Sequence, residues 1–218
     1  MLHLMEKEIR TQNKTALIVV FSILVLFYVT ASDNFAHSVV LNTLFFSVSV
    51  GFIGYLMSIQ SNFNTTEGER ANNWLLVSLP VSRIAVVRAK YMMILVWWLI
   101  AYALSLLLNM SLRLVPGQMS VAFSIPMSIL LSLCITVLFT GLSYPLYYWF
   151  GYRIAQLVVF FLFFAMISLT GTVNQFIGLK GVTDISPVGL LLVFAAVTLV
   201  VAACSYVISV RIFLKRDF

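Results

Sequence analysis

Long apolar runs alternate with short polar segments along most of the chain. When each charged residue and His37 are treated as breaks, six runs are long enough for a membrane-spanning helix, which needs about 20 mainly apolar residues. The runs are Thr15 to Ser32, Ser38 to Thr66, Tyr91 to Leu112, Leu114 to Tyr152, Ile154 to Leu179 and Ile185 to Val210. The fourth run is too short for two spans and a turn, so it predicts one long helix with interfacial ends. We therefore predict six spans, at about 15–32, 38–60, 84–109, 121–148, 154–175 and 187–210.

The composition supports this interpretation, because 62% of the residues are apolar and only 9% are charged. Soluble domains hold about 25% charged residues. We therefore expect an all-α integral membrane protein with a single transmembrane domain over residues 1–218.

The first fourteen residues have an amphipathic pattern. Leu2, Met5 and Ile9 share one helical face, and charged residues occupy the other. This pattern predicts a short helix over residues 1–14 that lies in the membrane interface. A frayed polar leader is the alternative. A cleaved signal peptide is disfavoured, because acidic residues lie among the cations and five more spans follow.

Basic residues predict the orientation, because cytoplasmic loops hold an excess of Lys and Arg. With six spans both termini lie on one side, and that side carries all but two of the 13 Lys and Arg residues. The two exceptions are Arg113 and Lys180. We therefore expect cytoplasmic N- and C-termini. The net charge of +6 is then explained by topology and by contact with anionic membrane lipids. No nucleic-acid partner is expected, because the cations are spread over four segments.

Candidate chemistry is sparse in this sequence. Cys134 and Cys204 lie in predicted spans, and His3 and His37 stand alone, so no metal-ligand spacing exists. The sequence has no GxxxxGK[ST] loop, so any ATP must be bound by another chain. The predicted spans contain no Asp, Glu or His, which disfavours an intramembrane enzyme and a proton-coupled transporter. We therefore predict no catalytic residue, metal site or cofactor in this chain.

The loop between the second and third spans, NTTEGERANNWLLVSLPVSR, has strong helix boundaries. Thr66 followed by Glu69 is a capping box, and Pro80 disfavours helix at the residue before it. These signals predict a short helix over residues 67–79. Ser82 is a suitable N-cap for a second helix, which continues as the third span.

The short predicted helix is unusually apolar for a loop. Trp74, Leu75, Val77 and Leu79 cover most of its circumference, and a narrow polar stripe covers the rest. A free cytoplasmic loop should expose less apolar surface. The helix either rests on the inner leaflet and neighbouring spans or inserts into a groove on a cytoplasmic partner, and the residues alone leave both roles open.

The loop also resembles that of a known family. An acidic, Asn-containing stretch is followed by leucines, SLPVSR, two valines and AKY, after the second of six spans. This arrangement is similar to the small ABC-2 type permeases, the membrane subunits of bacterial ATP-binding-cassette transporters. The resemblance implies two permease subunits, identical or homologous, each bound by a cytoplasmic ATPase that holds ATP and Mg. It also implies that the loop helix is a coupling helix, which contacts the ATPase through Glu67, Glu69, Arg70, Asn73, Trp74, Leu75, Leu79, Pro80, Ser82 and Arg83.

The same resemblance implies that the second and fifth spans border the subunit interface and the substrate path. Small and polar residues of these spans are the candidates: Asn42, Ser47, Ser49, Gly51, Gly54, Ser168, Thr170, Asn174 and Gln175. Ordinary helix packing and lipid contact are the alternative roles for each of them. A path without fixed charges favours an amphipathic or apolar cargo, because a hydrophilic ion would meet unmatched polar groups at high cost.

These expectations describe a multi-pass permease subunit of the bacterial cytoplasmic membrane. It is expected to export an amphipathic peptide, an antibiotic or a lipid, with ATP hydrolysed by a separate subunit. The alternative is a non-transport membrane protein, such as an immunity or scaffold protein, whose loop helix rests on the inner leaflet.

Overall fold

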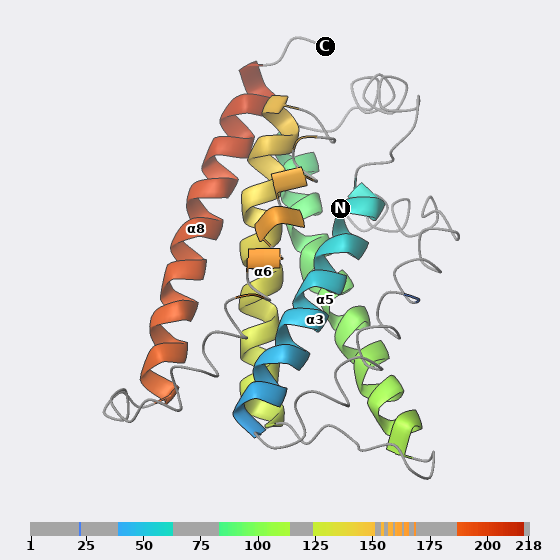
Figure 1. Cartoon of the computed structure of the whole chain (residues 1–218). Helices are drawn as coiled ribbons and strands as arrows, with labels where there is room; N and C mark the ends of the chain where they lie inside the picture. The colour runs from blue at the N-terminus through green and yellow to red at the C-terminus, as the bar shows by residue number, and fades with distance from the viewer. Residues whose placement is uncertain are drawn as a thin grey trace.

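The structure is a computed structural model that describes residues 22, 39–62, 83–113, 124–150 and 187–215, with parts of 154–168. Four long helices lie side by side (Figure 1). They are α3 (Val39–Asn62), α5 (Arg83–Arg113), α6 (Ile125–Phe150) and α8 (Pro187–Lys215). The C-terminal ends of α3, α6 and α8 and the N-terminal end of α5 lie at the same end of the bundle.

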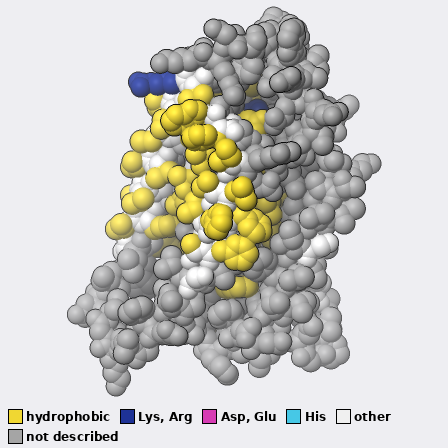
Figure 2. Space-filling view, turned by 45° about the horizontal axis from the view of Figure 1, so that its top comes forward, with side chains coloured by type: hydrophobic (Ala, Val, Ile, Leu, Met, Phe, Trp, Pro, Cys, Tyr) yellow, Lys and Arg dark blue, Asp and Glu magenta, His cyan; other side chains and the backbone are white. Residues whose placement is uncertain are grey.

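This shared end carries most of the charge of the four helices. Its basic residues are Arg83, Arg88, Lys90, Arg211 and Lys215. We call the end of the bundle that these residues define the basic end. Arg113 is the last residue of α5, at the opposite end, and the four helices contain no Asp or Glu. Among the described side chains in Figure 2, basic ones lie at one border of an apolar area.

The start of α6 is held by α3. The backbone N–H of Ser124 donates to the Thr43 hydroxyl at 3.1 Å, and the Ser124 carbonyl accepts from the N–H of Ser128 at 2.9 Å. The first of these bonds satisfies a backbone N–H that a helix N-terminus otherwise leaves open, and the second is the first bond of the helix itself. Pro126 follows in the first turn, where the missing N–H costs nothing. The contact therefore fixes the two helices against each other at the end opposite the basic end.

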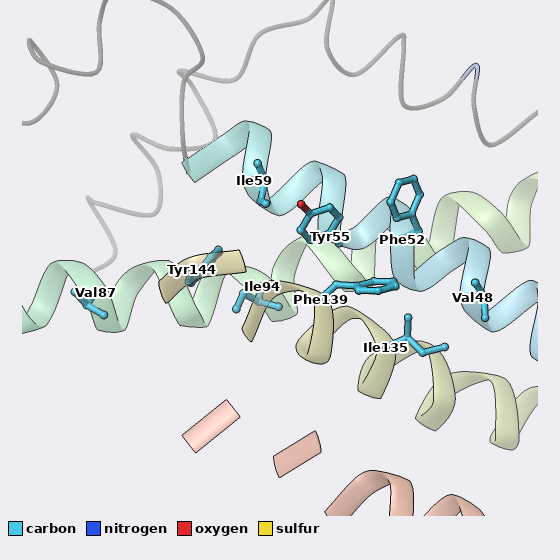
Figure 3. Packing of buried hydrophobic residues seen from close by; sticks show 9 residues of the cluster. All are labelled: Val48, Phe52, Tyr55, Ile59, Val87, Ile94, Ile135, Phe139 and Tyr144. Atoms are coloured by element: carbon cyan, nitrogen blue, oxygen red, sulfur yellow. The ribbon is translucent and has the colours of Figure 1, made fainter. Parts of the chain in front are cut away.

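The core consists of side chains from α3, α5 and α6. Figure 3 shows Phe52 and Tyr55 of α3 beside Phe139 of α6. Their rings lie 5.8 to 6.3 Å apart, the separation typical of favourable aromatic pairs. Other members of this cluster are Val48, Ile59, Val87, Ile94, Ile135 and Tyr144. The cluster joins one face of α3 to α6.

A second apolar cluster joins the other face of α3 to α5. It contains Phe46, Val50, Ile53 and Met57 of α3 and Met93, Trp97, Ala101 and Tyr102 of α5. α3 is therefore enclosed by its neighbours on two sides, whereas α8 packs mainly on α6. Among the four long helices α3 is the most buried, and α6 packs against all three others.

The outward faces of the bundle are apolar. The exposed side chains of α5 recur every three or four residues and include Met92, Leu95, Leu99, Ala103, Leu107 and Met110. Exposed leucines and valines follow α8 in the same way. All four helices are long and apolar enough to cross a membrane. Such faces fit a hydrocarbon environment, and the prediction of an all-helical membrane protein is confirmed.

The helices overlap four of the stretches in which spans are predicted, namely the second, third, fourth and sixth. In the first stretch the described residue is Ser22, which is helical, and helical residues are also found between 154 and 168. The interfacial helix over 1–14 and the coupling helix over 67–79 lie outside the described residues. The predicted number of six spans thus stays a prediction.

Candidate functional site

Three of the polar residues predicted for a substrate path lie in the bundle interior. Asn42, Ser47 and Ser49 of α3 are all buried. The Ser47 hydroxyl donates to the Thr43 carbonyl at 2.6 Å, and the Ser49 hydroxyl donates to the Phe45 carbonyl at 2.8 Å. These bonds satisfy the two serines within their own helix, as buried polar groups require. In this structure the three side chains contribute to packing inside the subunit.

Gly51 and Gly54 lie where α3 approaches its neighbours most closely. A Cβ atom on Gly51 would be 2.5 Å from Cγ2 of Ile135, and one on Gly54 would be 3.2 Å from the side chain of Thr136. The hydroxyl of Thr136 donates to the Gly51 carbonyl at 3.2 Å. Small residues thus allow a close contact between two helices, which is the usual basis of association between spans. Here that contact is with α6 of the same chain.

A row of hydroxyl groups follows one face of α6, and its role was missed by reasoning from the sequence. The row consists of Ser128, Ser132, Thr136, Thr140 and Ser143, all fully buried. Each donates to a backbone carbonyl one turn earlier in α6. The spacing of four, four, four and three residues places them on one helical face, so the periodicity could have revealed the row.

Two aromatic residues of α5 reach this row. The indole N–H of Trp98 donates to the Ser132 hydroxyl at 3.1 Å, and the hydroxyl groups of Tyr102 and Ser128 are 3.0 Å apart. Hydrogen bonds between helices help to hold spans together, because lipid provides no hydrophobic drive for their association. The row therefore joins α6 to α5 as well as to α3.

Tyrosines form a second group of contacts at the basic end. Tyr91 of α5 lies within hydrogen-bond distance of two serines of α8, with oxygen separations of 2.7 Å to Ser205 and 3.1 Å to Ser209. Tyr144 of α6 lies 2.9 Å from Ser58 of α3. The rings of Tyr91 and Tyr144 meet edge to face, with centroids 5.0 Å apart. This group connects all four long helices.

The residues predicted to contact an ATPase fall largely outside the described part of the chain. Glu67, Glu69, Arg70, Asn73, Trp74, Leu75, Leu79, Pro80 and Ser82 are not described. Arg83 is the first residue of α5. The segment in question therefore leads directly into α5, the helix that carries Tyr91.

Of the residues predicted for a substrate path in the fifth span, the structure describes Ser168 alone, and it is helical and exposed. Thr170, Asn174 and Gln175 lie outside the described residues. Phe160, in the described part of the same stretch, contacts Phe52 of α3 with ring centroids 6.4 Å apart. This ring contact joins the stretch to α3.

The described residues contain no group of three or more His, Cys, Asp or Glu side chains that could hold a metal ion. Both cysteines are free thiols; Cys134 is buried and Cys204 is exposed. The polar groups brought together are hydroxyls, amides and indoles. Such groups hold helices together and can line a path, but they supply no fixed charge.

Long apolar helices, buried hydroxyl rows and apolar outward faces define a multi-pass helical membrane protein. The profile of the family described as ABC-2 family transporter protein matches residues 3–214. The match covers nearly the whole chain, and the chain therefore belongs to this family. No match was found among curated proteins or solved structures.

Family membership makes the chain the membrane component of an ABC transporter. Such components lack the ATPase domain, bind no cofactor and work with separate ABC ATPase subunits. The predicted family and the assignment of ATP hydrolysis to another chain are thus confirmed.

Proposed function

We propose that this chain is the permease subunit of an exporter of amphipathic peptides, antibiotics or lipids. It would pair with a second permease subunit, identical or homologous, and each would bind one cytoplasmic ATPase. The observation that carries this proposal is the family match over residues 3–214. Export of an amphipathic cargo is supported by the described helices, which contain hydroxyl and amide groups but no Asp, Glu or His.

The orientation proposed for the subunit places the basic end in the cytoplasm. Arg88, Lys90 and Arg211 lie at this end, and cytoplasmic ends of spans hold an excess of basic residues. The segment from 67 to 79 then lies in the cytoplasm, next to the start of α5. We assign it as the coupling helix, with Trp74, Leu75 and Leu79 as apolar anchors and Glu69, Arg70 and Asn73 as the polar rim.

The proposed substrate path is built from residues of the second and fifth spans. Asn42, Ser47 and Ser49 are satisfied inside the subunit in the structure, so they would reach a cargo only if α3 and its neighbours separate. Ser168 is exposed and accessible without such a change. Thr170, Asn174 and Gln175 continue the same polar stretch along the sequence.

A pull-down of the tagged protein from its native membranes in mild detergent tests the proposal. We expect an ABC ATPase in stoichiometric amount, identified by mass spectrometry and by ATP hydrolysis in the eluate. Trp74→Glu should remove at least nine-tenths of the ATPase, because a charged side chain cannot fill an apolar pocket.

The matched control is Trp149→Glu. Trp149 is exposed at the end of α6, also at the basic end, but it lies outside the proposed coupling helix. This variant should retain the ATPase. If the wild-type protein is folded and inserted but binds no ATPase, the exporter proposal fails, and a membrane scaffold whose loop rests on lipid becomes the better interpretation.

A further inference from the structure

Tyr91 is placed to connect the start of α5 with its neighbours. It lies two turns after Arg83, the first residue of α5. Its hydroxyl reaches both Ser205 and Ser209 of α8, at 2.7 and 3.1 Å. Residues four apart on a helix share a face, so the two serines offer their oxygens together from successive turns. One side chain is thereby held at two points on α8.

The ring of Tyr91 makes further contacts with two tyrosines. Its centroid lies 5.0 Å from that of Tyr144 on α6 and 5.3 Å from that of Tyr206 on α8. Both pairs are nearly perpendicular, at 86° and 89°, which is a favourable edge-to-face geometry. We call Tyr91, Tyr144, Tyr206, Ser205 and Ser209 the tyrosine clamp. Through the bond between Tyr144 and Ser58 it extends to α3.

The far half of α5 is connected differently. There Trp98 and Tyr102 bond to Ser132 and Ser128 of α6, and α8 takes no part in these bonds. The clamp therefore joins α5 to α8 close to the point where α5 begins. Any force applied to the segment before α5 reaches the clamp within two helical turns.

We propose that Tyr91 is a positioning residue for energy coupling, which makes α8 follow α5 when an ATPase moves the segment before it. This inference rests on the proposed function. A helix transmits displacement along its own axis, but its neighbours follow only if lateral contacts hold them. In lipid each such contact is weak, so losing two hydrogen bonds from one side chain should release α8 from α5, while α8 stays packed on α6.

Tyr91 lies outside the proposed coupling helix, and energy coupling gives this residue a role. Tyr91 closes the stretch SLPVSRIAVVRAKY, eleven residues beyond Pro80. It lies in the described part of α5, where its side chain points away from the exposed stripe that includes Met92 and toward α8. A phenylalanine here would keep the ring contacts and lose the hydroxyl.

The test uses the complex of permease and ATPase reconstituted in liposomes, with single spin labels on exposed positions beside the clamp. Met92→Cys reports on α5 and Val207→Cys reports on α8, in a background where Cys134 and Cys204 are alanine. Trapping with ATP, Mg and vanadate should change the label spectrum at both positions in the otherwise unmodified protein. In Tyr91→Phe the response of the α5 label should persist, and that of the α8 label should fall at least threefold.

Two variants separate this role from a general loss of packing. Tyr102 lies on the far half of α5, and its hydroxyl contacts Ser128 of α6. Tyr102→Phe removes this hydroxyl and should leave the responses of both labels intact. The double variant Ser205→Ala with Ser209→Ala removes the partners of Tyr91, and it should reproduce the loss at the α8 label.

The inference is overturned if Tyr91→Phe leaves the α8 response at its full size. It is also overturned if vanadate trapping changes the α5 label but not the α8 label before any clamp residue is altered. Failure of the proposed function has a different signature, because no ATPase then copurifies and neither label responds. ATPase binding to Tyr91→Phe, measured in the same pull-down, should equal that of the parent.

Discussion

α3 and α8 are both long apolar helices, yet they occupy opposite environments. Within the apolar window of each helix, 83% of α3 is buried inside the structure, compared with 11% of α8. Within these windows α8 has the highest mean hydropathy of the four long helices and α3 has the lowest. A soluble protein would show the reverse order, because there the most apolar helix is driven inward.

The reversal follows from the solvent. Lipid tails are as apolar as leucine, so an apolar face gains nothing by leaving them. Hydroxyl and amide groups do gain, because hydrocarbon offers them no hydrogen-bond partner. The polar residues of α3, among them Asn42, Ser47 and Ser58, therefore favour its burial inside the bundle. The apolar α8 can remain at the edge of the described bundle.

The largest expected effect comes from truncating an aromatic side chain in α3, the most buried of the four long helices. Phe52→Ala removes a ring that is 2% exposed and contacts Tyr55 and Phe139. It should lower the free energy of unfolding by about 3–5 kcal/mol. Leu199→Ala on α8 is the matched variant, because Leu199 is 70% exposed, and it should cost less than about 0.5 kcal/mol.

Reversible unfolding in mixed SDS micelles would measure both free energies. Equal costs for the two truncations would show that α8 is as enclosed as α3, and the contrast between the helices would then be wrong.

A smaller effect is expected at the contact between α3 and α6. Gly51→Ala would place a methyl group 2.5 Å from Ile135 and 3.2 Å from the backbone oxygen of Ser132. Such overpacking costs about 1–3 kcal/mol. Gly141→Ala is the control, because its new methyl group would meet α8 at ordinary contact distances of 3.8 Å and more.

Thermal unfolding in detergent, followed by size-exclusion chromatography, would rank these two glycine variants. Gly141→Ala should match or slightly exceed the wild type, since alanine favours a helix. If Gly51→Ala is equally stable, the two helices are not in close contact at this position.

The sequence predicted the long helices because their signal is local. Charged residues or His37 bound each apolar run, and each long helix overlaps one run. α5 ends at Arg113, which closes its run, and it begins at Arg83, directly after the predicted N-cap Ser82. Helix starts were also readable from nearby residues, although α6 begins at Ile125 rather than near 121. At that start Thr43, from a distant part of the sequence, accepts a hydrogen bond from the backbone of Ser124.

The arrangement of the helices could not be predicted in the same way. Nothing in the local pattern of Gly51 distinguishes a contact within the chain from one with a second subunit, because a small residue permits either. The row from Ser128 to Ser143 was readable as a periodicity, but its partners Trp98 and Tyr102 belong to another helix. Tyr91 belongs to the stretch that resembles the family, but its bonds to Ser205 and Ser209 are visible only in the structure.

The smallest effect concerns two neighbouring tryptophans of α5. The indole N–H of Trp98 donates to Ser132, whereas that of Trp97 is buried with no hydrogen-bond partner in the structure as described. Phenylalanine at either position removes the N–H and part of the ring.

A double-mutant cycle with Ser132→Ala separates the hydrogen bond from the loss of packing. The coupling between Trp98→Phe and Ser132→Ala should be about 0.6 kcal/mol, the average for hydrogen bonds between spans. The coupling between Trp97→Phe and Ser132→Ala should be zero, because Trp97 packs toward α3 and makes no bond to the row. A coupling of equal size in both cycles would mean that Ser132 acts through packing alone, and that α5 is held to α6 at this point by shape rather than by hydrogen bonds.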